Sequence, residues 1–141
     1  MRSRIFLHLV WTTLDRNPLI DGARAEFLWR YFKYVAAQEH VAILACGMVA
    51  THVHMVVHTG ATFDGARLAQ RLKGGSATIA AQQEIGDVTH PLRWAKGYSV
   101  QSVSARALGP VIRYVEGQAR NHPEEAIPGW RPEAMAHALA R

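Results

Sequence analysis

A chain of 141 residues that is 49% hydrophobic and 19% charged can bury a real core and fits a single compact domain. Its 16 Lys and Arg residues against 11 Asp and Glu residues give a net charge of +5, which favours an anionic partner. The single cysteine excludes an internal disulfide and a cysteine-rich zinc module, and no apolar segment approaches the ~20 residues that a bilayer crossing needs. We therefore expect a cytoplasmic protein with no membrane partner.

The first part of the chain predicts a helix between two strands. Residues 5–12 are rich in β-forming side chains and end at a polar turn, so they predict a well-buried first strand. Asp21 is placed to cap a helix that runs to about residue 39. A second strand is predicted at residues 41–48, and a turn over residues 47–51 returns the chain into an antiparallel third strand. Apolar side chains at helical spacing predict the buried face of the helix, and they are Phe27, Leu28, Tyr31, Phe32 and Val35.

The third strand, residues 51–58, carries two histidines on one face. Because side chains alternate along a strand, His52 and His54 point one way while Val53 and Met55 point the other. Two neutral imidazoles side by side form half of a metal site if another element supplies a further ligand. The alternative is that both are polar groups satisfied within the sheet.

Two more histidines are predicted near this face. His58 shares it but lies beside a turn, so we expect its side chain to be solvated. His8 on the first strand either lines the same face or is a satisfied core histidine, and the core role is favoured.

A second helix is predicted after Asp64, with basic residues along one side. The pair Gly74-Gly75 is expected to interrupt it, because glycine costs ~1 kcal/mol in a helix interior, unless a kink or a close approach of the backbone to a neighbour is required there. The basic side is either simply solvated or seats a DNA phosphate backbone, for which side-chain and backbone N–H groups are suitable donors. The candidate phosphate contacts on this helix are Arg67, Arg71, Lys73 and Ser76.

The last part of the chain completes the predicted fold. After a loop over residues 86–97, an alternating pattern predicts a fourth strand at residues 98–103. Ser104 is expected to cap a final helix, regular from residue 110 to residue 121 because proline is tolerated only in the first turn. We expect residues 123–141 to form a tail with a short helix in its Ala-rich segment, to which no chemistry is assigned. The order of elements predicts an α+β, ferredoxin-like sandwich with helices packed on a four-stranded antiparallel sheet.

Two polar residues of the final helix, Tyr114 and Gln118, lie four positions apart and therefore on the same face, which Asn121 extends. This polar stripe is either an exposed side of the helix or part of a site. For an isolated tyrosine and glutamine, the exposed side is the favoured interpretation.

Four groups of residues, taken together in this order, resemble one family. They are His52-Val53-His54; Leu72-Lys73-Gly74 with Ser76; Trp94-Ala95-Lys96-Gly97-Tyr98 with Ser102-Val103-Ser104; and Tyr114-Val115-Glu116-Gly117-Gln118 with His122. The combination resembles the single-tyrosine transposases of the His-hydrophobic-His endonuclease superfamily, particularly those associated with repetitive extragenic palindromes in bacteria. It spans about residues 5–122, so we expect the transposase domain to occupy residues 1–122.

The resemblance implies an enzyme that cuts single-stranded DNA bearing hairpins or palindromic repeats, leaves a 5′-phosphotyrosine and a free 3′-hydroxyl, and rejoins strands. It implies Tyr114 as the nucleophile, His52 and His54 as metal ligands, and Gln118 as a third ligand. Tyrosine, with an ordinary pKa of ~10, is a poor nucleophile at neutral pH, so the metal must help by polarising the phosphate. Mg²⁺ or Mn²⁺ suits mixed imidazole, amide and phosphate ligands. Lys96 joins the candidate DNA contacts, and a homodimer is implied.

The chain also departs from the family. Thr51 stands where the family commonly carries an aspartate, which can change how the neighbouring imidazoles are oriented. Gly117 and the proline-containing tail are also unlike many relatives. The alternative function is a nucleic-acid-binding domain that does not cut and needs no metal. A zinc hydrolase is less favoured, because only two strong soft-metal ligands are well placed.

Overall fold

The structure is a computed structural model that describes residues 5–130. Within these residues, four strands form one sheet in the order β2-β3-β1-β4, and every neighbouring pair is antiparallel. The predicted four-stranded antiparallel sheet is therefore confirmed, and β3, which carries the histidine pair, is an interior strand. The strands are β1 (Ile5–Thr12), β2 (Ala42–Val49), β3 (His52–Thr59) and β4 (Ser99–Val103).

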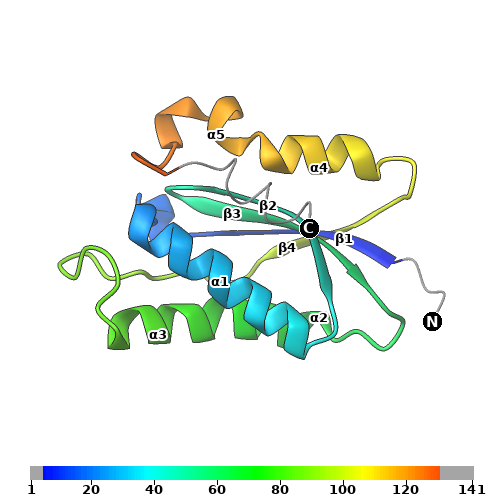
Figure 1. The fold of residues 1–141 in the computed structure, drawn as a ribbon, viewed down its shortest axis with the longest axis horizontal. Helices are drawn as coiled ribbons and strands as arrows, with labels where there is room; N and C mark the ends of the chain where they lie inside the picture. The colour runs from blue at the N-terminus through cyan, green and yellow to red at the C-terminus, as the bar shows by residue number, and fades with distance from the viewer. Residues whose placement is uncertain (1–4, 131–141) are drawn as a thin grey trace.

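Helices cover both faces of this sheet, as Figure 1 shows. One face carries α1 (Gly22–Gln38) and a continuous helical segment made of α2 (Gly65–Gln70), the π-helical turn η2 (Arg71–Gly75) and α3 (Ser76–Gln82). The other face carries α4 (Leu108–Glu116) and α5 (Gln118–Asn121). Short 3₁₀ turns lie at Leu14–Arg16 and Pro123–Glu125. This succession of elements confirms the predicted ferredoxin-like α+β sandwich.

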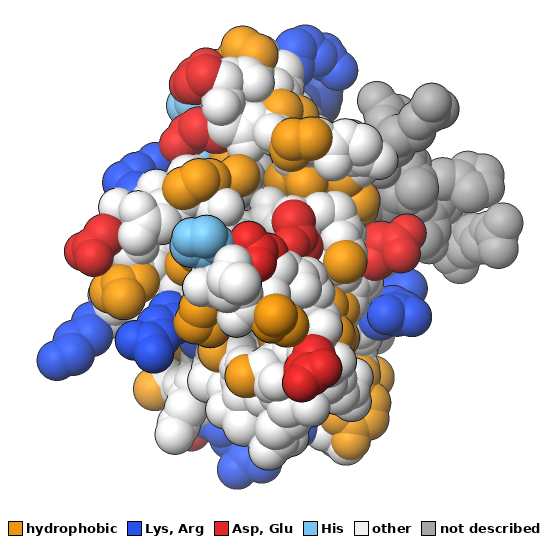
Figure 2. All heavy atoms as spheres, turned by 90° about the vertical axis from the view of Figure 1, so that its left-hand side faces the viewer, with side chains coloured by type: hydrophobic (Ala, Val, Ile, Leu, Met, Phe, Trp, Pro, Cys, Tyr) orange, Lys and Arg blue, Asp and Glu red, His pale blue; other side chains and the backbone are white. Residues whose placement is uncertain are grey.

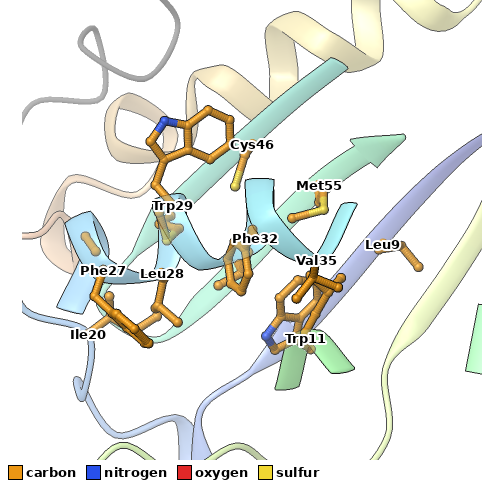
Figure 3. Packing of buried hydrophobic residues seen from close by; sticks show 14 of the residues in the cluster. Leu9, Trp11, Ile20, Phe27, Leu28, Trp29, Phe32, Val35, Cys46 and Met55 are labelled. Carbon is orange, nitrogen blue, oxygen red and sulfur yellow. The ribbon is translucent and has the colours of Figure 1, made fainter. Parts of the chain in front are cut away.

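The main core lies between the sheet and α1. The Asp21 side chain accepts a hydrogen bond of 2.9 Å from the backbone N–H of Arg24 and so caps α1 as predicted. Phe32 of α1 packs edge-on against Trp11 of β1, with ring centroids 5.5 Å apart (Figure 3). The residues predicted for the buried face of this helix are buried, except for Tyr31, which is half-buried.

The predicted interruption at Gly74-Gly75 is wrong, because the chain remains helical from Gly65 to Gln82. The alternative of a close backbone approach is confirmed at Gly75. A Cβ there would lie 1.9 Å from the hydroxyl oxygen of Tyr31, so only glycine fits against α1 without a shift.

The final helix differs from its prediction at both ends. It begins at Leu108 and breaks at Gly117, where the predicted helix continued to residue 121. Glycine is a weak helix former, and here it separates α4 from the single turn of α5. The Ser104 side chain accepts from the backbone N–H of Ala107 at 3.1 Å, so it closes the turn before the helix and does not cap the helix itself.

The packed part of the chain extends past the expected domain boundary at residue 122. Ile127 is buried in the main core, and the partly buried Trp130 packs against this core. The backbone N–H of Ala50 donates to the carbonyl of Glu125 at 2.7 Å, which ties this segment to the end of β2. The Ala-rich segment that was expected to be helical lies outside the described residues. None of the helices between residues 5 and 130 has the length and apolar character that a membrane crossing requires.

Candidate functional site

A close contact between α4 and the sheet creates the site. A Cβ at Gly47 would lie 1.9 Å from the backbone carbonyl oxygen of Val115, so the missing side chain lets α4 lie directly on β2. Val115 is fully buried there against Ala45 and Val56. Gly47 is the cross-strand neighbour of His54. The residues that follow Val115 are thereby brought over the histidine face of β3.

His52 faces the side-chain amide of Gln118. The Nε2 atom of His52 lies 3.2 Å from Oε1 of Gln118, and Gln118 is only 1% exposed. The Nε2 atom of Gln118 donates to the backbone carbonyl of Tyr114 at 3.0 Å, which turns its oxygen toward the histidine. The favoured interpretation of this polar stripe as an exposed side of the helix is therefore wrong for Gln118, which is buried.

The other ring nitrogen of His52 is also bound. Its Nδ1 lies 3.0 Å from Oγ1 of Thr51, and the Thr51 hydroxyl donates to Oε1 of Glu125 at 2.7 Å. This hydrogen bond is the main reason that the pKa of Glu125 is lowered. A carboxylate from the segment after α5 is thus connected to the first histidine of β3.

His54 is bound through Nδ1 to His8 of β1. Its Nδ1 atom lies 2.9 Å from Nε2 of His8, and the two rings stack with centroids 5.1 Å apart. Burial, reinforced by the neighbouring His52 and His8, lowers the pKa of His54 to about 3, and burial also lowers the pKa of His52. Both imidazoles are therefore neutral at physiological pH, which is the form that ligates metals.

The favoured expectations for His8 and His58 were wrong. His8 lines the same face as His54 and is half-buried there, because neighbouring antiparallel strands present their side chains in register. His58 is half-buried too, with its ring centroid 5.0 Å from that of Phe6, and is not simply solvated.

Tyr114 stands beside these histidines and remains accessible. Its ring lies edge-on to His54, with centroids 5.6 Å apart, and edge-on to His8 at 6.4 Å. The residue is 47% exposed. A phenol that contacts the buried His54 and the half-buried His8 on one side and solvent on the other can meet a substrate that approaches from outside.

A second group of possible metal ligands lies next to the first. One ligand atom from each of His122, Glu124 and Glu125 falls within 4.8 Å of the others. The His122 ring centroid is 5.6 Å from that of His52. Glu124 is exposed, and exposed acidic groups of this kind are common without an ion.

The candidate DNA contacts of the second helix lie on the opposite face of the sheet. Arg67 and Arg71 share the carboxylate of Glu39, with nitrogen–oxygen distances of 3.0 and 2.8 Å. The α2 to α3 segment packs through Leu68 and Leu72 on the α1 side of the sheet. These arginines are therefore not part of the histidine cluster.

Lys73 and Ser76 are used within the fold. The Lys73 ammonium donates to the backbone carbonyls of Ala95 and Gly97 at 2.8 and 2.6 Å. Ser76 is completely buried, donates to the carbonyl of Lys73 and accepts from the indole N–H of Trp94. Lys96, between the two carbonyls that Lys73 holds, is exposed.

The face of the molecule shown in Figure 2 has no separate basic patch. On the face shown in Figure 2, acidic and basic side chains are interspersed with hydrophobic ones. The net charge of +5 is therefore not gathered into one basic patch on that side.

Sequence reasoning missed one residue of the site, Glu125. It lies 74 residues from Thr51 in the chain, in a segment to which no chemistry was assigned. No sequence pattern places Glu125 near the histidines, because its contact with Thr51 depends on the path that the chain takes after α5. His122 was part of the motifs quoted above, although no role followed from its position.

The sequence of the chain is similar to those of known transposases. A family model described as IS200-like transposase matches residues 1–118. The chain is also 24% identical over 114 residues to the ISDra2 transposase TnpA of Deinococcus radiodurans, a match that covers 79% of this chain and 81% of that protein.

Two solved structures are similar in fold. One is a transposase-like protein from D. radiodurans, with a TM-score of 0.64 and 21% identity, covering 84% of this chain and 93% of that chain. The other is a REP-associated tyrosine transposase bound to a REP hairpin, with a TM-score of 0.68 and 12% identity. This match covers 93% of this chain and 74% of that chain. At these identities the two structures establish the fold of this chain.

Proposed function

Because the chain belongs to the family of IS200-like transposases, we propose that it is a metal-dependent endonuclease that cuts single-stranded DNA through Tyr114 and rejoins the strands. The observation that carries this proposal is the convergence of His52, His54 and Gln118 beside the accessible ring of Tyr114. Three different elements, β3, α5 and α4, supply these groups.

The residues present fit a divalent cation. Nε2 of His52 and Oε1 of Gln118 face each other at 3.2 Å, and the Gln118 amide N–H is already used by the Tyr114 carbonyl. When Nε2 carries its lone pair, two acceptors oppose each other, an arrangement that a cation between them relieves. The His52 and His54 rings lie 5.0 Å apart, so the second imidazole is close enough to share one ion. Mg²⁺ or Mn²⁺ suits this set of ligands.

We assign the chemistry as follows. When bound, the cation polarises the scissile phosphate and compensates the charge that develops on it. The phenol oxygen of Tyr114 attacks phosphorus, an oxygen–phosphorus bond forms, and the bond from phosphorus to the 3′-oxygen breaks. The phenol loses its proton and the departing 3′-oxygen gains one, which leaves a 5′-phosphotyrosine and a free 3′-hydroxyl. Reversal of this step with another 3′-hydroxyl rejoins a strand.

We propose hairpin-bearing or palindromic single-stranded DNA as the substrate, by analogy with the similar structure that holds a REP hairpin. Arg67, Arg71 and Lys96 are exposed or partly exposed cations that can contact phosphates. The two arginines lie across the sheet from Tyr114, so they would contact DNA that flanks the cleaved strand.

We further propose a homodimer, as the resemblance to the transposases implies. The supporting feature is β4, an edge strand whose residues are exposed except for the half-buried Val103. Unpaired strand edges readily pair with another chain. Light scattering during size-exclusion chromatography tests this: a mass of one chain at all concentrations would contradict the proposal.

The deciding experiment traps the covalent adduct. Wild-type protein and Tyr114→Phe are mixed with hairpin-bearing single strands and Mn²⁺, and tryptic peptides are analysed by mass spectrometry. We expect a nucleotide on Tyr114 in the wild type, no adduct in the variant, and DNA binding in both. Tyr98→Phe serves as a control that keeps the adduct, because Tyr98 precedes β4 at the sheet edge. A nucleotide on any other tyrosine, or DNA binding without any adduct, would contradict the assignment; the second result favours a binding domain that does not cut.

A further inference from the structure

Three side chains form a directed chain of hydrogen bonds that ends at His52. Glu125 accepts from the Thr51 hydroxyl at 2.7 Å, and Oγ1 of Thr51 lies 3.0 Å from Nδ1 of His52. An ionised carboxylate can only accept a hydrogen bond, so the single hydroxyl proton of Thr51 points toward Glu125. Oγ1 can then only accept from the histidine, which requires a proton on Nδ1.

We propose that Glu125, acting through Thr51, is a positioning residue that holds His52 in the tautomer with a proton on Nδ1 and a free lone pair on Nε2. The inference rests on the proposed function, in which Nε2 of His52 faces a divalent cation. It assigns a role in the site to the segment after α5. Ligating histidines are generally oriented in this way by an acceptor on their second ring nitrogen.

The connection is built into the packed part of the molecule. Thr51 is buried, and the backbone of Glu125 is itself anchored by the N–H of Ala50. Two residues later, Ile127 is buried in the core. The Glu125 carboxylate also lies 3.5 Å from the guanidinium of Arg16. Glu125 is therefore held by contacts on several sides and is available to fix the Thr51 proton.

The opposite tautomer of His52 would block metal binding. If Thr51 lacked its hydroxyl, or if the hydroxyl proton were released from Glu125 and turned to Nδ1, His52 would carry its proton on Nε2. That proton would point to Oε1 of Gln118, 3.2 Å away, and form an ordinary hydrogen bond. Both atoms would then be engaged with each other, and a cation would have to displace the proton to reach them.

Four variants of the full chain separate these states. Thr51→Val keeps the shape of the side chain and removes the hydroxyl, and Glu125→Ala removes the acceptor. Thr51→Ser retains the hydroxyl and serves as the rescue. Glu124→Gln removes a neighbouring charge that makes no contact with Thr51 and serves as the matched control. Thermal unfolding of each variant confirms that the fold is kept.

Two measurements are made on every variant. Nitrogen-15 NMR of the metal-free protein reports which ring nitrogen of His52 carries the proton. Electron paramagnetic resonance of added Mn²⁺ reports the affinity of the metal. In the wild type, Thr51→Ser and Glu124→Gln, we expect a proton on Nδ1 and equal Mn²⁺ affinity. In Thr51→Val and Glu125→Ala, we expect a proton on Nε2 and an affinity lower by about 10–100-fold.

The outcomes distinguish the inference from the proposed function. If the wild type binds no Mn²⁺, the metal-dependent function is contradicted, whereas the tautomer shift in Thr51→Val and Glu125→Ala still supports the positioning role. If Mn²⁺ binds but these two variants keep the wild-type tautomer and affinity, the positioning role is overturned. It is overturned as well if Glu124→Gln weakens Mn²⁺ as much as Glu125→Ala does, because the ion would then lie on the His122 group.

Discussion

The backbone of Gly47 lies so close to the carbonyl of Val115 that a Cβ on residue 47 would be 1.9 Å from its oxygen. In Gly47→Ala either α4 must move away from β2 or the strand must shift. We expect the free energy of unfolding to fall by about 1–3 kcal/mol, the usual cost of overpacking, and adduct formation at Tyr114 to be lost. Urea unfolding and the adduct assay measure the two effects.

Gly74→Ala is the matched control for this prediction. No atom lies within 4 Å of a Cβ at Gly74, and the residue is helical. We expect unchanged adduct formation and a gain of up to about 1 kcal/mol, because alanine is the better helix former. Equal behaviour of the two variants would show that the close approach at Gly47 has no consequence for the site.

Replacing either histidine of β3 tests the proposed metal site. His52→Ala and His54→Ala should each abolish Mn²⁺-dependent cleavage while the thermal unfolding midpoint changes by only a few degrees, because the core of the domain lies mainly on the other face of β3. His58→Ala changes a histidine on the same face of the same strand and should retain cleavage. Wild-type cleavage rates in the first two variants would contradict the metal site.

The salt dependence of DNA binding tests the proposed phosphate contacts. Removing a cation that touches phosphate weakens binding to all sequences alike and lowers the slope of log affinity against log salt by about one. We expect this for Lys96→Gln, Arg67→Gln and Arg71→Gln, measured by fluorescence anisotropy. Lys33→Gln is the control, since the Lys33 ammonium lies over the Trp29 ring of the same helix. If the arginine variants keep the wild-type slope, Arg67 and Arg71 pair with Glu39 and do not contact phosphate.

Burial of His54 predicts a pH dependence of stability. Its pKa is lowered from 6.5 to about 3, so between these values the unfolded chain binds a proton that the folded protein does not. The contribution of neutral His54 to the free energy of unfolding is therefore fully present above pH 6.5. It declines as the pH falls below that value, by at most ~1.4 kcal/mol per pH unit. Urea unfolding with EDTA present, above pH 6.5 and about one unit below it, measures the loss. His54→Asn should show a smaller pH dependence, and an equal one would contradict the assignment to His54.

The sequence by itself determined the elements and the faces of the strands. Alternation in β3 separates His52 and His54 from Val53 and Met55, and the structure has the same separation. Asp21 and Asp64 accept from the backbone N–H of Arg24 and Arg67, as caps placed by local spacing should. These features depend on residues a few positions apart, so backbone geometry alone decides them.

Only the tertiary structure decided which groups meet on the histidine face. His52 and Gln118 are 66 residues apart, and Thr51 and Glu125 are 74 apart. Their contacts depend on the break at Gly117 and on the approach of Val115 to Gly47, neither of which has a periodic signal in the chain. His8 shows the same limit: its strand was predictable, but the ring it contacts was set by the pairing of β1 with β3. Strand register and helix docking are properties of the packed molecule, because they are selected by the joint burial of segments distant in sequence.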